Sequence, residues 1–109
     1  MEAKAIAKQI RISPQKARLV TRMIQGQNVS EALRRLKFSN KKAAVLVSSV
    51  LRSAIANATV KGAADDTLKV KYAIIDEGPR LKRFRPASRG RAMRIIKRTA
   101  HISVTVCDQ

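Results

Sequence analysis

Aromatic residues, cysteine and histidine are scarce in this chain. Its 109 residues include no tryptophan, one histidine and one cysteine, and aromatics make up 3%. Hydrophobic residues still account for 45%, which is enough for one core built from alanine, valine, isoleucine and leucine. Cys107 excludes an internal disulfide, is typical of a reducing compartment, and is interpreted as a small core residue. No apolar run approaches the ~20 residues of a membrane span, and the N-terminal segment lacks a signal-peptide pattern, so we expect no membrane contact and a cytoplasmic location.

Acidic residues are also scarce, which argues against metal-dependent chemistry. The chain has 7 Asp and Glu residues against 24 Lys and Arg residues. A two-metal nuclease needs carboxylates that converge on one site, whereas Asp65-Asp66 is interpreted as a turn and Asp76-Glu77 as a strand end. There is no glycine-rich phosphate loop and no Cys/His zinc cluster. We therefore expect no catalytic residue, no metal and no cofactor, and a protein that is not an enzyme.

What the chain has in excess is positive charge. Its net charge of +17 destabilises a compact fold through self-repulsion unless a polyanion offsets it. The charge is densest in residues 78–100, GPRLKRFRPASRGRAMRIIKRTA, which contain nine Lys or Arg residues and no Asp or Glu. Such a segment cannot bury enough apolar surface to fold alone. Its excess of arginine favours specific contacts with phosphate oxygens and bases, so the composition predicts nucleic acid as the partner.

Three helices are expected, and the first two begin at clear capping residues. Ser13-Pro14 is a suitable N-cap and first-turn pair for a helix over residues 15–25. Asn28 is a second N-cap candidate, and Glu31 would complete a capping box at the start of a helix over residues 30–38.

The third expected helix covers residues 41–60, with Ser39-Asn40 as its N-cap. Its broad apolar face predicts a central helix that packs against several elements. That face comprises Ala44, Val45, Leu46, Val47, Val50, Leu51, Ala54, Ile55 and Ala58.

Three segments alternate between apolar and polar residues as strands do, namely residues 3–12, 67–75 and 100–107. The last two bracket the basic stretch, so we expect them to pair antiparallel. The side chains expected to face the core are Ile6, Ile10 and Ile12, then Leu68, Val70, Tyr72 and Ile74, then Ile102, Val104 and Val106.

The connection between the last two strands is too long for an ordinary structureless loop. We expect a hairpin over about residues 78–100 that continues past the domain edge and turns near residues 86–90. The expected fold is thus α+β: a single compact domain over residues 1–109, with three helices packed on a small three-stranded antiparallel sheet and a long protruding basic β-hairpin. An arm of about ten residues reaches about 30 Å, and a bare ribbon is marginal in water, so we expect a mobile tip in the isolated protein.

A second basic set lies on the helical part of the chain. Cations at a helix start oppose the macrodipole, so Lys41 and Lys42 favour a role in phosphate contact, with a solvated face as the alternative. Phe84 lies among cations, where it either stacks on a base or packs against neighbouring side chains. The basic set comprises Arg11, Lys16, Arg18, Arg22, Lys41 and Lys42.

Three segments together carry a family resemblance: ISPQKARLV (12–20), NKKAAVLVSSVLRSAIANA (40–58) and DEGPRLKRFRPASRGRAMRIIKRTAHISV (76–104). Nearly end to end, the chain resembles the ribosomal protein L twenty-two family of the bacterial type. The resemblance implies a structural constituent of the large ribosomal subunit that binds large-subunit ribosomal RNA, lies beside other large-subunit proteins and supports assembly. It also implies a hairpin that lines the nascent polypeptide exit tunnel near the site where macrolide antibiotics act. No homo-oligomer is expected.

Carried over by position, the resemblance assigns RNA contacts to both parts of the chain. The hairpin tip over residues 84–91 would line the tunnel, and Ala87-Ser88 departs from the Arg-Ala of many relatives, which puts one contact there in doubt. The tip residues are Phe84, Arg85, Pro86, Ala87, Ser88, Arg89, Gly90 and Arg91. The implied RNA contacts are Ser13, Lys16 and Arg18 on the first helix, and Arg80, Lys82, Arg83, Arg94, Lys97, Arg98 and His101 on the hairpin and its base.

Other functions are less compatible with the sequence. A free nucleic-acid-binding regulator or RNA chaperone would use the same basic ribbon, but a β-ribbon reader is usually a dimer and no second apolar face is evident. A nuclease lacks converging acids. A membrane-active peptide is disfavoured because the basic stretch has no amphipathic helix pattern.

Overall fold

The protein is seen here in a computed structural model that describes residues 2–63, 67–86, 88–90 and 92–108. The elements in chain order are β1 (Glu2–Ile10), α1 (Pro14–Ile24), α2 (Val29–Lys37), α3 (Lys42–Val60), β2 (Lys69–Glu77), β3 (Leu81–Pro86), the short 3-10 turn η2 (Ser88–Gly90), β4 (Ala92–Lys97) and β5 (Ala100–Cys107).

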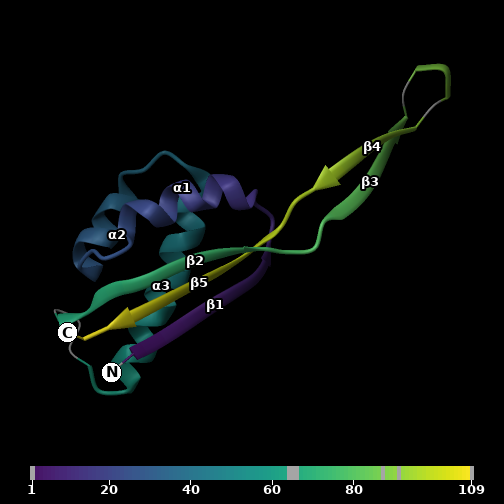
Figure 1. Cartoon of the computed structure of the whole chain (residues 1–109). Helices are drawn as coiled ribbons and strands as arrows, with labels where there is room; N and C mark the ends of the chain where they lie inside the picture. Colours follow the sequence, from purple (N-terminus) through teal and green to yellow (C-terminus); the bar gives the residue numbers. More distant parts are fainter. Residues whose placement is uncertain (1, 64–66, 87, 91, 109) are drawn as a thin grey trace.

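The main sheet has three antiparallel strands in the order β1-β5-β2. β5, the last strand in the chain, lies in the middle, where Cys107 is in register with both Glu2 of β1 and Lys69 of β2. β3 and β4 pair only with each other in a separate two-stranded sheet, which extends from the domain as an arm (Figure 1). The α+β architecture of three helices and a three-stranded antiparallel sheet is therefore confirmed.

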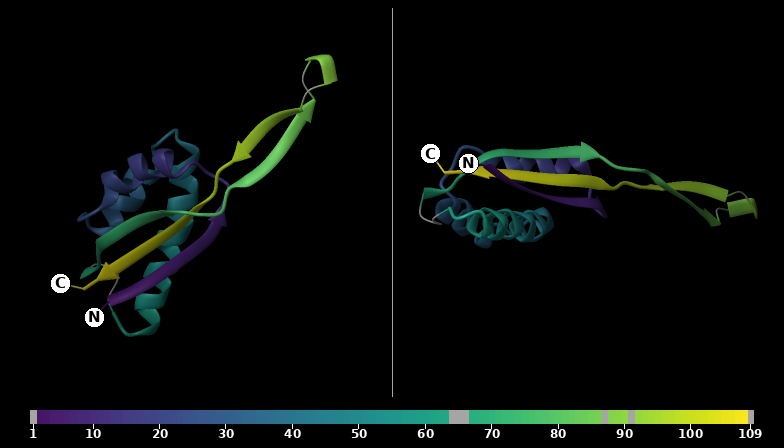
Figure 2. Two further views of the ribbon diagram at one scale, coloured as in Figure 1. Left: turned by 45° about the vertical axis from the view of Figure 1, so that its right-hand side comes forward. Right: turned by 90° about the horizontal axis from the view of Figure 1, so that it is seen from below.

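The core lies between the sheet and the helices, which cover one face and leave the other open (Figure 2). α3 packs against β1 and β5, and α1 packs against β2. Alternate residues of β5 point into this core, as predicted: Ile102, Val104 and Val106 are fully buried. The predicted stripe of α3 is buried at Ala44, Val47, Leu51, Ala54 and Ala58.

α1 and α2 begin after the predicted N-cap residues, with two differences from prediction. Ser13 is the N-cap of α1 but makes no side-chain capping hydrogen bond. The Asn28 side chain accepts a 3.1 Å hydrogen bond from the Ser30 amide, so Asn28 is the N-cap of α2. Glu31 does not complete a capping box, because its carboxylate binds Arg34 and Arg35 one turn further along the helix. These pairs lower the pKa of Glu31, chiefly through the hydrogen bond from Arg34.

α3 differs from prediction at its start and on one side. Its N-cap is Lys41, which makes no side-chain capping bond, and Val45 is 71% exposed instead of joining the buried face. By length and composition alone, α3 is apolar enough to cross a membrane, contrary to the expectation from sequence. Its buried face packs on the sheet, as in the core helix of a soluble protein.

Two strands, β2 and β1, bury other side chains than those expected from alternation. The register of β2 against β5 shifts between Val70 and Tyr72, so Tyr72 and Ile74 face the open side and Ala73 and Ile75 are buried instead. In β1 the alternation has the opposite phase to the one expected, with Ala3 buried and Ile6 50% exposed, ahead of the register shift between Ala7 and Ile10.

Two further expectations about strand residues were wrong. β1 ends at Ile10 after a second register shift, in which Gln9 takes a positive φ of 56°, so Ile12 lies outside the strand although it is buried. Cys107 is half-buried and in register with the open-face residues Glu2 and Lys69, so it is not a core residue.

Each outer strand of the main sheet has an edge residue that is hydrogen-bonded to a neighbouring segment. Val70 of β2 accepts a hydrogen bond from Gly26 and donates one to Gln27, each 2.8 Å long. The Asn57 side chain of α3 donates to the Lys4 carbonyl of β1 at 3.0 Å. These contacts occupy backbone groups that would otherwise recruit a further strand.

The arm gives the protein an elongated shape, with extents of 62 × 25 × 16 Å. β3 and β4 are in register from Leu81↔Lys97 to Pro86↔Ala92, and the turn between them includes Arg89 and Gly90, both with positive φ. The arm joins the domain through Gly78, whose amide donates to the Thr99 carbonyl at 3.0 Å. Buried Thr99 in turn donates its hydroxyl to the Pro79 carbonyl at 2.6 Å.

Candidate nucleic-acid interface

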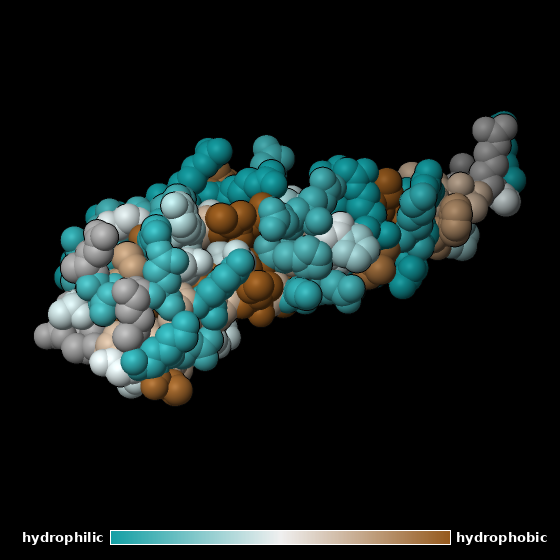
Figure 3. Space-filling model, turned by 60° about the horizontal axis from the view of Figure 1, so that its bottom comes forward, coloured by the Kyte–Doolittle hydropathy of each residue, from teal (hydrophilic) through white to brown (hydrophobic). Residues whose placement is uncertain are grey.

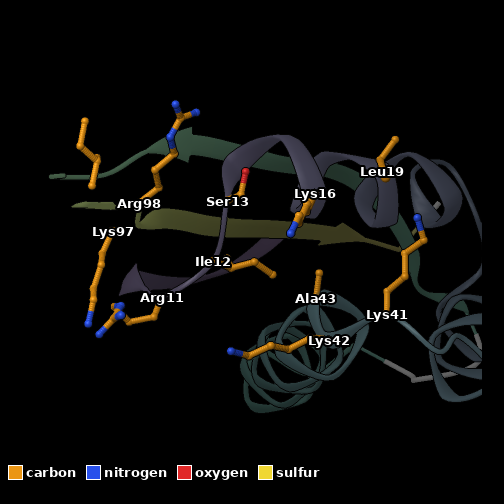
Figure 4. Close-up of a pocket in the computed structure, with 11 residues that line it drawn as sticks. Arg11, Ile12, Ser13, Lys16, Leu19, Lys41, Lys42, Ala43, Lys97 and Arg98 are labelled. Atoms are coloured by element: carbon orange, nitrogen blue, oxygen red, sulfur yellow. The ribbon is translucent and has the colours of Figure 1, made fainter. Parts of the chain in front are cut away.

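A hollow of about 730 Å³ lies where the base of the arm meets the domain. We call it the junction trench. Its walls come from three separate stretches of chain: the entry to α1, the start of α3, and the end of β4 (Figure 4). The residues that line it are Arg11, Ile12, Ser13, Lys16, Leu19, Lys41, Lys42, Ala43, Ile96, Lys97 and Arg98.

The charges of the junction trench all have one sign. Its lining includes the cations Arg11, Lys16, Lys41, Lys42, Lys97 and Arg98, and no Asp or Glu. Within the described part of the chain, none of these cations forms an ion pair. The two helices that begin here add no acid, because neither α1 nor α3 has an acidic residue in its first turn. The trench is therefore a site of strongly positive potential that suits a polyanion.

The side chains follow the length of the trench (Figure 4). Arg11 and Lys97 extend toward the end near the arm, and Lys42 reaches in the same direction from α3. Lys16 points into the space between α1 and α3, and Lys41 lies at the far end with Leu19. An extended anion could therefore meet cations along the whole trench.

Seven of the residues predicted to bind RNA thus come together in one site, although they are far apart in sequence. These are Arg11, Ser13, Lys16, Lys41, Lys42, Lys97 and Arg98.

Arg18 and Arg22 lie on exposed positions of α1, outside the trench. Arg18 reaches across to β2 and donates to the Ile75 carbonyl at 3.1 Å. It therefore covers part of the sheet edge, and its remaining donors stay available to a ligand. Arg22 lies in the last turn of α1, where a cation is favourable for the helix dipole.

Cations of the arm are largely exposed. Lys82, Arg83 and Arg94 lie on β3 and β4 with their side chains in solvent. Arg80, just before β3, instead binds the Glu77 carboxylate at 2.8 Å. Arg80 lowers the pKa of Glu77, with smaller contributions from Arg98 and Arg18. Arg80 therefore brings less net positive charge to the surface than its neighbours do.

His101 has a structural partner. Its Nδ1 accepts a 3.0 Å hydrogen bond from the amide of Gln9, the residue with positive φ at the bulge of β1. With Nδ1 acting as acceptor, the other ring nitrogen carries the proton of the neutral imidazole. His101 thus holds the register of β1 near the arm, whether or not its ring also meets RNA.

The tip residues that the structure describes project far from the domain. Phe84 is 70% exposed, and its register partner is Arg94, so no core holds its ring. Arg85, Pro86 and Arg89 are exposed as well, and Ser88 and Gly90 belong to the turn. Ala87 and Arg91 lie outside the described residues.

Outside the trench, hydrophilic residues predominate on the face that Figure 3 shows. Figure 3 shows polar residues over most of one face of the domain and along the arm, with separate hydrophobic patches between them. Among the described residues, no group of His, Cys, Asp or Glu side chains is placed to hold a metal ion.

Comparison with known families agrees with this arrangement. The family model described as ribosomal protein L22p/L17e matches residues 5–107. The chain belongs to this family. The resemblance carried by the three sequence segments is thereby confirmed. As an L22p/L17e protein, the chain is a structural constituent of the large ribosomal subunit, which in bacteria is cytoplasmic, and it binds ribosomal RNA beside neighbouring ribosomal proteins. The family is one of structural proteins and not of enzymes.

The apolar members of the trench were not predicted as site residues of this L22p/L17e protein. Leu19 is 46% exposed on α1, and Ile96 is 41% exposed on β4. Leu19 did carry a signal, because it lies off the buried stripe of Ala17, Val20 and Ile24. Ile96 carried no such signal in the sequence, because its position in the trench depends on where the arm leaves the domain.

Proposed function

We propose that the domain and the base of the arm anchor this protein on large-subunit ribosomal RNA, and that the arm extends through the RNA so that its tip lines the nascent polypeptide exit tunnel. The observation that carries the proposal is the arm itself. It is a two-stranded ribbon that packs extensively only on itself, and its cations point into solvent on an extension of the domain.

Such a ribbon is not expected to be stable on its own. Two strands alone are marginally stable in water, and adjacent like charges repel. Surrounding RNA supplies opposite charge on all sides and releases condensed counterions when it binds. The arm thus fits a protein that is completed by its RNA partner.

The same charge suggests a role in assembly. RNA segments that converge in a folded subunit repel one another through their phosphates. A cationic arm that passes between them, with exposed residues such as Lys82, Arg83 and Arg94, would offset that repulsion.

The tip would contribute less to affinity than the anchor does. Phe84, Arg85 and Arg89 are exposed and have room to meet a nascent chain or a macrolide in the tunnel. The Ala87-Ser88 pair, in place of the Arg-Ala of many relatives, removes one cation from this wall.

Sedimentation of a cell lysate followed by a high-salt wash of the large subunits tests the anchoring. We expect the protein to remain with the washed large subunit. If it washes off, or sediments with DNA or free RNA, a free nucleic-acid-binding regulator or RNA chaperone is the better description.

A photoreactive phenylalanine analogue at position 84 tests the tunnel role. In ribosomes stalled with a radiolabelled nascent chain, we expect the analogue to crosslink to that chain. The control carries the analogue at Val60, which is 87% exposed but lies on the domain, and should give no nascent-chain product. Equal products from both positions, or none from position 84, would contradict a tip in the tunnel.

A further inference from the structure

We propose that the junction trench binds a single stretch of RNA backbone that spans the arm and the domain, and that its occupancy sets the orientation of the arm. This inference rests on the proposed function, because it names the site at which ribosomal RNA acts and what binding there does.

The arm is attached to the domain by a narrow junction. β3 and β4 make extensive contacts only with each other, and the two-stranded sheet is separate from the main sheet. The backbone bond between Gly78 and Thr99 and the side-chain bond from Thr99 to Pro79 hold the two strands together at this point. They join strand to strand and do not brace the arm against a helix, so the direction of the arm relative to α1 and α3 is weakly determined.

The junction trench is a cavity that the arm and the domain both line. Ile96, Lys97 and Arg98 come from the arm and its base, and the rest of the lining comes from the domain. Any ligand that contacts both walls therefore fixes the angle between them. A ligand that binds one orientation of the arm more tightly than the others increases the population of that orientation, to an extent set by the difference in affinity.

The charges oppose closure of an empty trench and favour it with RNA. Arg11 of the domain and Lys97 of the arm extend toward the same end of the trench, and its described lining contains no carboxylate. Like charges separated by less than the Debye length of about 8–10 Å repel at physiological ionic strength. A phosphodiester backbone reverses the sign of the interaction, since each phosphate can bind cations from both walls.

The shape and lining favour a strand of RNA over a compact anion. The cations are spread along the trench from Lys97 to Lys41, so several phosphates in succession are needed to meet them. Leu19 and Ile96, both about half exposed, offer aliphatic surface to riboses or base faces, which a simple inorganic anion would leave uncovered.

Pulsed electron paramagnetic resonance between two spin labels tests this proposal. The labels are placed on Ala92→Cys of the arm and Val45→Cys of α3, both exposed, in a Cys107→Ser background. The probe is large-subunit ribosomal RNA. For the otherwise native chain, we expect a broad distance distribution in the free protein and a single narrow one with RNA.

Two matched double variants separate the trench from the arm. Lys16→Gln with Lys42→Gln neutralises two domain-side cations of the trench, while Arg83→Gln with Arg94→Gln removes the same charge from the arm. Each pair should lower the salt dependence of RNA binding, by about 0.7–0.9 in the log–log slope for every phosphate that the variant no longer neutralises. At saturating RNA, we expect the distance distribution between the two labels to be narrow in the native chain and in the arm variant, and to stay broad in the trench variant.

The outcomes distinguish this inference from the proposed function. The role of the trench is overturned, while RNA binding stands, if RNA narrows the distance distribution of the trench variant as much as that of the native chain. It is also overturned if the distance distribution of the arm variant stays as broad with RNA as that of the trench variant. A native distribution that RNA leaves unchanged overturns it too. Failure of the native protein to bind ribosomal RNA at all would instead refute the proposed anchoring.

Discussion

Substitution of Gly78 by alanine tests how the arm is joined to the domain. An ideal Cβ at Gly78 would lie 2.5 Å from Thr99 Oγ1 and 3.3 Å from the Thr99 carbonyl carbon. Thr99 is buried, and its hydroxyl donates to the Pro79 carbonyl, so the side chain cannot rotate away without breaking that hydrogen bond. The added methyl group therefore meets an atom that is held in place.

Opposing contributions set the size of the effect. Loss of the hydrogen bond costs about 0.5–1.5 kcal/mol, and overpacking costs about 1–3 kcal/mol. Against these, Gly→Ala stabilises by about 0.4–1 kcal/mol through the unfolded chain where the native backbone permits alanine. Gly78 is not among the glycines with positive φ, so its backbone does permit alanine. We expect a net loss of about 1–3 kcal/mol in the free energy of unfolding.

The double-mutant cycle with Thr99→Ala gives the decisive result. Thr99→Ala alone should cost about 1 kcal/mol through the lost hydrogen bond. In that background Oγ1 is gone and the closest remaining approach is 3.3 Å, to the Thr99 carbonyl carbon, so Gly78→Ala should cost at least about 1 kcal/mol less than it does in the native chain. Urea unfolding followed by far-ultraviolet circular dichroism measures all four proteins. If Gly78→Ala destabilises both backgrounds equally, Thr99 does not determine the need for glycine, and the reasoning fails.

Three further perturbations address the core, the surface charges and the arm. Leu51→Ala, at a fully buried position of α3, should cost about 2–5 kcal/mol in urea unfolding. Val45→Ala, at an exposed position of the same helix, should change stability by less than about 0.5 kcal/mol, and equal effects would contradict the assigned core. Because Arg34 and Arg35 lower the pKa of Glu31 in the folded state, its stabilisation is present above the ordinary glutamate pKa and is lost as pH falls through the lowered value. Thermal melts between about pH 6 and pH 3 should therefore show a shallower acid loss for Glu31→Gln, and an unchanged profile would count against the pair. Replacement of residues 81–97 by an Asn-Gly turn should leave a cooperatively folded domain that binds ribosomal RNA more weakly, and loss of the folded circular dichroism spectrum would show that the arm belongs to the core.

The fold was predictable where the hydrophobic spacing is uninterrupted. β5 alternates without a break, and the buried stripe of α3 from Ala44 to Ala58 repeats over about four turns, so both elements and these core positions followed from the sequence. The inward face of β2 did not, because one bulged residue near Lys71 reverses the side of every residue after it, and no local pattern marks a bulge.

The sequence predicted which residues belong to the candidate site, but not that they lie together in one trench. Arginine density identified the arm, and helix starts identified Lys16, Lys41 and Lys42. Their meeting with Lys97 in one trench depends on the packing of α1 beside α3 and on the direction in which β4 leaves the sheet. Such long-range geometry has no signature in sequence spacing. The same is true of Arg18, which binds a carbonyl 57 positions away in sequence.

The central place of β5 bears on how the protein is made. β1 and β2 are not neighbours in the sheet, and the strand that lies beside each of them is β5, which follows every other element in the chain. During synthesis the two earlier strands therefore wait, without a sheet partner, until β5 has left the ribosome that makes it. The helices can form as they emerge, but the sheet and the buried face of α3 close in one late step across nearly the whole length of the chain. Until then a highly cationic, incompletely folded chain is exposed to every RNA nearby, so a cell has reason to keep synthesis and incorporation close together in time.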